Sequence, residues 1–177
     1  MVFFRKESLL VLGIMFVSLN IDAQMLNKEG LIGKSLPESF SLRLLQAPDT
    51  VLVNSNVLNG HVVVLEFWGT WCAPCIKTIP HMNELVHAFR DAPVTFISIT
   101  DESKAIVQRF LKRKKMSSWI GLDLDRELTE WAEISSYPTV LVLDTNGIVQ
   151  EVMNPDQLDI STIETYLDNT TNNEEND

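Results

Sequence analysis

The 177-residue chain contains few residues of the types that bind metals, because it has two cysteines and three histidines. A sulfur-rich zinc site takes more cysteines than this. Positive charge is also scarce, because 24 acidic residues outnumber 14 basic residues and give a net charge of −10. Nucleic acid is therefore disfavoured as a partner, since its phosphates are repelled by an acidic protein.

Long hydrophobic runs are absent too. The apolar run Leu9–Leu19 is shorter than the roughly 20 residues of a membrane-spanning helix. It follows two basic residues and precedes Ala23, which is the layout of an export signal over residues 1–23. Ile21 is bulkier than the small residue preferred near a cleavage site, so an uncleaved anchor is the alternative. Membrane contact is expected only if this segment is retained.

The rest of the chain has the length of one domain, over residues 24–168, and a domain of this size needs no disulfide to hold its core. Residues 169–177 are polar and acidic and are expected to form a disordered tail. A crosslink between cysteines three positions apart closes a small loop and removes little chain entropy. The two cysteines are therefore a poor structural staple.

Hydrophobic periodicity predicts an α/β domain, a mixed β-sheet with helices on both faces. The run 62–67 is apolar except for Glu66 and begins with three β-branched valines, so it is expected to be a central strand. The next strand is reached through a helix and should lie parallel to it. The predicted order begins with a hairpin within 40–53, the strand 62–67, a helix over 73–90 kinked at Pro80, and the strand 94–99. Then follow a helix over 105–115, the strand 117–122, and a helix capped by Asp125 and ending near Ile134. The chain ends with a hairpin of strands 139–144 and 148–153 and with a helix that starts at Asn154 with Gln157 and buries Leu158, Ile160, Ile163 and Leu167.

Both cysteines stand in the stretch FWGTWCAPC, where the central strand gives way to a helix. Cys72 would face the free N–H groups and the positive dipole end of that helix, which favour a thiolate. We predict that it is the accessible nucleophile. Cys75 lies almost one turn further along and is more covered, as a resolving thiol requires. Pro74 fixes φ in the first turn of the helix.

Glu66 points to the side of the strand opposite to Leu65 and Phe67, toward the face that the helix should cover. A buried carboxylate is costly, and desolvation should raise its pKa. Such a group can accept the proton of Cys75 and return it. A carboxylate that reaches the sheet rim or is hydrogen-bonded for structure is the alternative.

Three alternatives to redox chemistry exist for the cysteines: a structural disulfide, half of a metal site and two unrelated core residues. No metal site is predicted, because the chain has no further cysteine and no histidine after His87. The strand-to-helix setting of the pair favours redox chemistry over all three.

The stretch FWGTWCAPC resembles the active-site signature of the thioredoxin superfamily, and within it that of the exported TlpA/ResA-like thiol-disulfide oxidoreductases. The resemblance runs from Leu31 to Leu167. Pro80 matches the proline that bends the first thioredoxin helix, and the stretch 103–134 matches the insertion typical of the TlpA/ResA group. The resemblance implies a thioredoxin-like fold with an N-terminal β-hairpin and a central helix/strand insertion.

The resemblance also implies that Pro138 is the cis-proline that faces the active site and leaves the Tyr137 backbone open to a substrate strand. Thr78 stands where some family members carry an acid, and Glu66 occupies the position of thioredoxin's buried aspartate. Proton handling is therefore expected on Glu66. The residues expected to bind substrate are Trp71, Pro74, Tyr137 and Pro138.

These features imply an exported, periplasmic or extracytoplasmic enzyme that reduces disulfides in partner proteins through Cys72 and Cys75. It would be recharged by a membrane-borne thiol donor and need no cofactor besides its own disulfide. Its substrates stay open between the apocytochromes of cytochrome c biogenesis and other envelope proteins. A thiol oxidant or isomerase of the same fold is the alternative, and a copper carrier is less favoured because no distant histidine is available. A peroxidase is disfavoured, since neither cysteine is preceded by that family's Pro and Thr or Ser at the required spacing.

One cluster of positive charge, Arg109 and Lys112–Lys115, stands out in the predicted helix 105–115. Helical spacing places it opposite the apolar residues Ile106, Val107, Phe110 and Leu111. A solvated face is the simpler interpretation, and a surface that docks a partner is the alternative.

Overall fold

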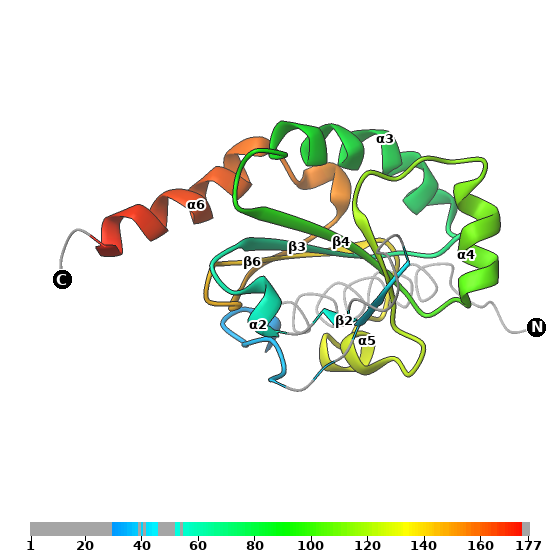
Figure 1. Cartoon of the computed structure of the whole chain (residues 1–177), viewed down its shortest axis with the longest axis horizontal. Coiled ribbons are helices and arrows are strands. Elements are labelled where there is room, and N and C mark those ends of the chain that lie inside the picture. Colours follow the sequence, from blue (N-terminus) through cyan, green and yellow to red (C-terminus); the bar gives the residue numbers. More distant parts are fainter. Residues whose placement is uncertain (1–29, 39, 41, 46–51, 54, 175–177) are drawn as a thin grey trace, which may run out of the picture. The chain divides into compact units, whose positions relative to one another are not determined.

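A mixed sheet with the strand order β2-β1-β5-β4-β3-β6-β7 is the frame of the described chain (Figure 1). The computed structural model describes residues 30–38, 40, 42–45, 52–53 and 55–174. Its strands are β1 (Leu42–Leu44), β2 (Leu52–Val53), β3 (Val62–Phe67), β4 (Val94–Thr100), β5 (Trp119–Leu122), β6 (Thr139–Leu143) and β7 (Val149–Met153). Its helices are α2 (Ser55–Leu58), α3 (Ala73–Ala88), α4 (Lys104–Leu111), α5 (Glu127–Trp131) and α6 (Ile160–Glu174). The chain divides into two compact units, Met1–Leu31 and Ile32–Asp177, and all of these elements lie in the second.

Strand β3 is the predicted central strand. It lies between the parallel strand β4 and the antiparallel strand β6, and all of its residues are buried. On one face, Val62 and Val64 pack with Met82 and Leu85 of α3 and with Ile163 of α6. Full burial of each valine side chain contributes about 1.5–3 kcal/mol. This packing holds α3, the helix that carries the cysteines, against the sheet.

Helices cover both faces of the sheet, as predicted. Helices α3 and α6 lie on one face, and α2 and α5 lie on the other (Figure 1). Helix α4 adjoins α3, because its residues Val107 and Phe110 belong to the same buried cluster as Cys72 and Cys75. The cysteines are therefore enclosed between the sheet and two helices.

The insertion expected from the resemblance comprises α4, β5 and α5. Strand β5 pairs with β4 on one side and with β1 on the other, so the insertion connects the N-terminal hairpin to the central sheet. Gly121 permits this close approach, since a Cβ atom there would meet the Leu42 side chain at 2.3 Å. The predicted N-terminal hairpin is confirmed by the antiparallel pairing of β1 with β2, while its turn lies outside the described residues.

Helix α4 is shorter than the predicted helix 105–115, because it ends at Leu111. Val107 and Phe110 are buried as predicted, but Ile106 is 44% exposed. The reason is that α4 contacts the core through a narrow stripe that contains Val107 and Phe110, and Ile106 lies at the edge of that stripe.

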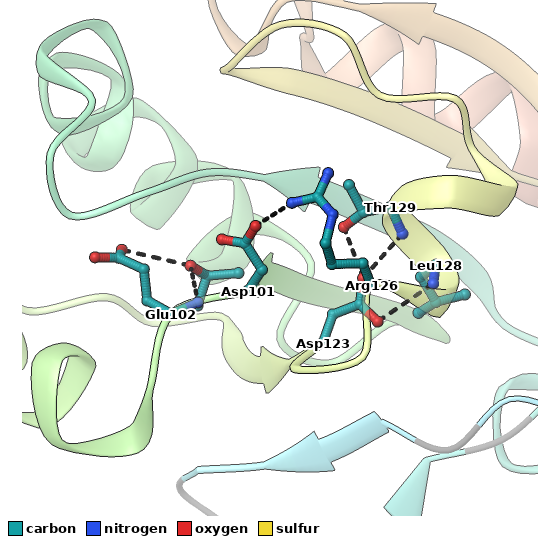
Figure 2. A network of polar contacts seen from close by, with 7 residues as sticks. Asp101, Glu102, Asp123, Arg126, Leu128 and Thr129 are labelled. Atoms are coloured by element: carbon teal, nitrogen blue, oxygen red, sulfur yellow. Dashed lines mark hydrogen bonds and ion pairs between the residues drawn. The ribbon is translucent and has the colours of Figure 1, made fainter.

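Helix α5 is capped by Asp123, and the prediction of Asp125 was wrong. The Asp123 carboxylate accepts hydrogen bonds from the backbone N–H of Thr129 at 2.9 Å and from that of Leu128 at 3.3 Å (Figure 2). Arg126 precedes the helix with a φ of 61°, and this left-handed turn brings Asp123 under the free N–H groups. Glu133, with a φ of 48°, ends the turn that follows, so the helix stops before the predicted Ile134.

The last helix begins later than predicted. Asn154 and Gln157 form the predicted capping box, in which the Asn154 N–H donates to Gln157 Oε1 at 3.0 Å, but they enclose a separate 3₁₀ turn. Asp159 then caps α6 by accepting the backbone N–H of Thr162 at 2.8 Å. Because α6 starts at Ile160, that side chain is 46% exposed and does not join the predicted buried stripe.

The predicted segment boundaries at the two ends fall mostly outside the described residues. Residues 1–23 are outside them, so the export signal stays a prediction. Helix α6 continues to Glu174, into the segment 169–177 that was predicted to be disordered. Within the part of the chain that the structure describes, no helix is long and apolar enough to cross a bilayer.

Candidate active site

Cys72 and Cys75 form a disulfide where β3 turns into α3, with their Cα atoms 5.3 Å apart. Cys72 is the N-cap residue of α3, and its Sγ accepts the backbone N–H of Cys75 at 3.2 Å. N–H groups at a helix N-terminus have no intrahelical partner and stabilise negative charge on a sulfur placed there. The capping position predicted for Cys72 is confirmed, and Pro74 lies in the first helical turn as expected.

Both cysteines are covered in this disulfide form, with Cys72 4% and Cys75 1% exposed. Cys72 is thus less accessible than predicted. The physical reason is packing, because the disulfide sits in one apolar cluster against which the Tyr137 side chain also packs. The buried side chains of this cluster, besides the cysteines, are Trp68, Ile79, Val107, Phe110, Ile120 and Leu122.

The Tyr137–Pro138 peptide bond is cis, as the resemblance implied. Phe67 of β3 pairs with Thr139 of β6, so the antiparallel ladder brings this loop opposite the turn that carries Cys72. The ring of Tyr137 lies 5.6 Å from that of Trp71, which is 68% exposed. Two of the residues predicted to bind substrate therefore form an aromatic pair beside the disulfide. Of the other two, Pro138 is half-buried and Pro74 is exposed.

Glu66 is buried in the layer between the sheet and α3. Its Oε2 accepts a hydrogen bond from Ser98 Oγ at 2.7 Å, and Ser98 Oγ lies 2.7 Å from Ser118 Oγ. Burial raises the pKa of Glu66 from its ordinary value of 4.5 to about 7, against the opposing effect of the hydrogen bond from Ser98. The predicted upward shift is confirmed. At this pKa the group changes between acid and carboxylate near neutral pH.

Two buried polar side-chain atoms have no hydrogen-bond partner among the described residues, Glu66 Oε1 and Trp68 Nε1. Alternation along the chain places both side chains on the sheet face that α3 covers, and Trp68 packs in the cluster around Cys75. A buried polar atom without a partner costs about 1–3 kcal/mol, and more when it is charged. The ionised form of Glu66 is therefore held at a cost, which protonation would relieve.

Glu102 is a site residue that the sequence analysis missed. Its carboxylate oxygens accept hydrogen bonds from the Thr70 backbone N–H at 2.6 Å and from Thr70 Oγ1 at 2.7 Å. Because Thr70 stands just before Trp71 and Cys72, Glu102 fixes the turn that leads into α3. A signal was present, since Glu102 follows the predicted strand 94–99, and the carboxyl ends of neighbouring parallel strands share one edge of the sheet.

A second polar network connects the insertion to the Tyr137 loop. Arg126 forms an ion pair with Asp101, which directly follows β4 (Figure 2). Arg126 and Thr129 lie near the Tyr137 phenol and act to lower its pKa. Burial raises the pKa of Tyr137, and the negative charge of Asp101 acts in the same direction. The insertion thereby positions the ring that packs against Trp71.

Thr78 supplies no acid near the sulfur atoms. Its hydroxyl donates to the Cys75 carbonyl oxygen at 2.9 Å, within α3. Among the residues that the structure describes, no three His, Cys, Asp or Glu side chains are grouped as a metal site requires.

Known proteins with similar sequences were found. The model of the AhpC/TSA family matches residues 32–152. The thiol-disulfide oxidoreductase ResA of Bacillus cereus is 32% identical over 121 residues, which cover 68% of this chain and 68% of that protein. The thiol-disulfide oxidoreductase ResA of Bacillus subtilis is 33% identical over 115 residues, which cover 60% of this chain and 64% of that protein.

Solved structures show the same fold. StoA from Bacillus subtilis matches with a TM-score of 0.59 and 23% identity, over 70% of this chain and 96% of that one. The thioredoxin domain of a thiol-disulfide oxidoreductase from Bacteroides vulgatus matches with a TM-score of 0.65 and 21% identity, over 77% of this chain and 97% of that one. The expected thioredoxin-like fold is confirmed.

Glu66→Gln is predicted to change how stability depends on pH. Folding raises the pKa of Glu66 from 4.5 to about 7, so the folded chain binds this proton more tightly than the unfolded chain and stability falls as pH rises through that window. The shift corresponds to roughly 3 kcal/mol. We measure the free energy of unfolding by urea denaturation. The value for the variant, relative to that for the wild type, should rise by up to about 3 kcal/mol between about pH 4 and pH 8.

The same substitution at the exposed residue Glu164 is the control for this measurement. It should leave the pH dependence of unfolding as it is in the wild type. Parallel curves for Glu66→Gln and the wild type would contradict the inferred effect of burial.

Proposed function

Since the chain belongs to the AhpC/TSA family and is a thiol-disulfide oxidoreductase of the ResA type, we propose that it reduces disulfides in proteins outside the cytoplasm. The observation that carries this proposal is the placement of Cys72 at the N-terminus of α3, opposite the cis Tyr137–Pro138 bond. The helix end favours the thiolate that attacks a disulfide, and the loop offers backbone groups to an extended substrate.

The reaction starts from the dithiol form. The Cys72 thiolate attacks one sulfur of the substrate disulfide, the substrate S–S bond breaks, and the departing substrate sulfur takes a proton from solvent. The Cys75 thiolate then attacks Cys72 Sγ, so the mixed disulfide breaks and the second substrate sulfur leaves as a thiolate, which takes a proton from solvent. The substrate gains two electrons and two protons, and the protein ends with the Cys72–Cys75 disulfide seen in the structure.

Glu66 acts as the base in the second exchange. A pKa of about 7 gives a substantial carboxylate fraction near neutral pH, and that carboxylate is buried in the same layer as Cys75. It accepts the Cys75 proton as this thiol begins its attack. When a thiol donor later reduces the disulfide, Glu66 returns the proton to Cys75.

The partners follow from the chemistry. The substrates are proteins that contain disulfides, and Trp71 and Tyr137 form the aromatic surface that meets them. Recharging needs a thiol donor, which we place in the membrane because the N-terminal layout indicates export. The apolar run Leu9–Leu19 would keep the protein near that donor if it is retained.

Cys75→Ser is predicted to trap substrates as mixed disulfides on Cys72, because the resolving attack is lost. Cys72→Ser should form no such adducts and should abolish exchange. Non-reducing gels followed by mass spectrometry of the crosslinked species measure both outcomes and name the substrates. Adducts that form only with Cys72→Ser would reverse the two assignments.

Ser98→Ala is predicted to shift the pH profile of the resolving step to higher pH. The hydrogen bond from Ser98 lowers the pKa of Glu66, so its removal raises that pKa above about 7 while the acid stays in place. Glu66→Gln should slow the same step by about 100-fold. Single-turnover decay of a mixed disulfide across pH measures the shift, and a midpoint unchanged in Ser98→Ala would speak against Glu66 as the base. The attack by Cys72 on the substrate, followed separately, is the internal control.

Redox titration of the Cys72–Cys75 pair distinguishes reduction from oxidation or isomerisation. A net reductant has a reduction potential below that of its substrates' disulfides. We therefore expect Cys72 and Cys75 to remain in the disulfide form at equilibrium with reduced substrate protein. Alkylation of free thiols, followed by the change in mass, measures this. A potential well above that of extracytoplasmic protein disulfides would exclude net reduction and favour the oxidant or isomerase.

A further inference from the structure

Positive charge is concentrated in one short segment. Six of the chain's 14 basic residues lie between positions 104 and 115, while all 24 acidic residues lie outside 104–122. The six are Lys104, Arg109, Lys112, Arg113, Lys114 and Lys115, and all are exposed. The ion pairs between described residues use Lys34, Arg90 and Arg126 instead. This segment is therefore a positive surface on an acidic protein.

A groove lies along the same segment. Its volume is about 620 Å³, and it is lined by Leu45, Ala105, Gln108, Arg109, Leu111 and Lys112. The lining combines leucine side chains with the cations of Arg109 and Lys112. A polypeptide that carries both apolar and acidic side chains complements such a lining, whereas a flat lipid surface does not enter a groove.

Helix α4 lies between the groove and the active site. On the inner side of α4, Val107 packs in the cluster around Cys72, and the Phe110 ring lies 5.3 Å from that of Trp68. Of the groove residues, Arg109 lies on the outer side of α4 and Lys112 directly follows the helix, and a helix is about 10 Å across. A segment bound in the groove would therefore stay close to the disulfide.

The basic segment is also fixed to the helix that carries the cysteines. Asn83 of α3 donates through Nδ2 to the Lys115 carbonyl oxygen at 3.0 Å and accepts the Ser117 backbone N–H at 2.7 Å. The charged end of the segment thus keeps a defined position relative to α3.

We propose that this basic groove binds an acidic and partly apolar segment of the protein whose disulfide Cys72 attacks. The interaction selects substrates and holds them beside the disulfide, and electrostatic attraction speeds their approach. The inference deepens the proposed function, on which it depends for the exchange step, while binding in the groove needs no chemistry.

Binding is tested first, with the full chain and two labelled peptides without cysteine. One alternates Leu with Glu, and the other carries Gln in place of Glu. Fluorescence anisotropy should show the acidic peptide binding about 10-fold more tightly at low salt, with the advantage falling as salt is added. Lys112→Glu and Arg109→Glu should remove the advantage. Arg90→Glu, an exposed residue that follows α3, makes the same charge change outside the groove and should keep it.

Exchange is tested next, with the same two sequences each carrying a disulfide loop. The kcat/KM for the acidic peptide should fall about 10-fold in Lys112→Glu, whereas reduction of the protein by dithiothreitol should not change. If the acidic peptide binds but its disulfide is not reduced, the proposed function is refuted while the docking surface is still supported.

Two outcomes of the peptide measurements would overturn the docking surface. One is that the wild type binds the two peptides equally tightly. The other is that Lys112→Glu and Arg90→Glu weaken binding of the acidic peptide equally. Vesicles of phosphatidylglycerol provide the comparison with a membrane. If they bind the wild type and not Lys112→Glu, while neither peptide binds, the segment contacts lipid and the proposal is wrong.

Discussion

The antiparallel pairing of β3 with β6 is the constraint on which the site depends. In this register Phe67 faces Thr139, so the end of β3 and the start of β6 lie side by side at one edge of the sheet. Neighbouring strands are about 4.8 Å apart, and the turn into α3 must therefore meet the Tyr137–Pro138 loop. The disulfide, the cis bond and the Trp71–Tyr137 pair come together because of this one register.

The same central strand carries a conflict between stability and chemistry. The apolar residues of β3 hold α3 in place, whereas Glu66 puts a carboxyl group into the layer that they exclude from water. Burial raises its pKa to about 7, and Ser98 supplies one hydrogen bond that partly restores the charged form. An apolar residue here would be the more stable choice at neutral pH, but it could not serve as the base that we propose for Cys75.

The loops after β4 and β5 connect the insertion to this edge of the sheet. Glu102 binds Thr70 in the turn before the cysteines, and Arg126 pairs with Asp101 and acts electrostatically on the Tyr137 phenol. The insertion and the loop that leads into it thus contact both sides of the disulfide without supplying a sulfur or a base. Its helix α4 contributes inward to the apolar cluster and outward to the basic groove, so one helix links packing at the cysteines to the charge of the surface.

The sequence by itself determined the central strand 62–67, the helix that starts beside Cys72, the parallel order of the next strand and the burial of Glu66. These depend on the spacing of apolar residues along one element and on the chemistry of neighbours in the chain, which are local properties. Only the tertiary structure decided that Asp123 caps α5 in place of Asp125, that Ile106 and Ile160 face solvent, that Glu102 holds Thr70, and how deeply Cys72 is covered. Each of these depends on contacts between residues distant in the chain or on a backbone turn such as that at Arg126. The periodicity of a single segment predicts neither such contacts nor such turns.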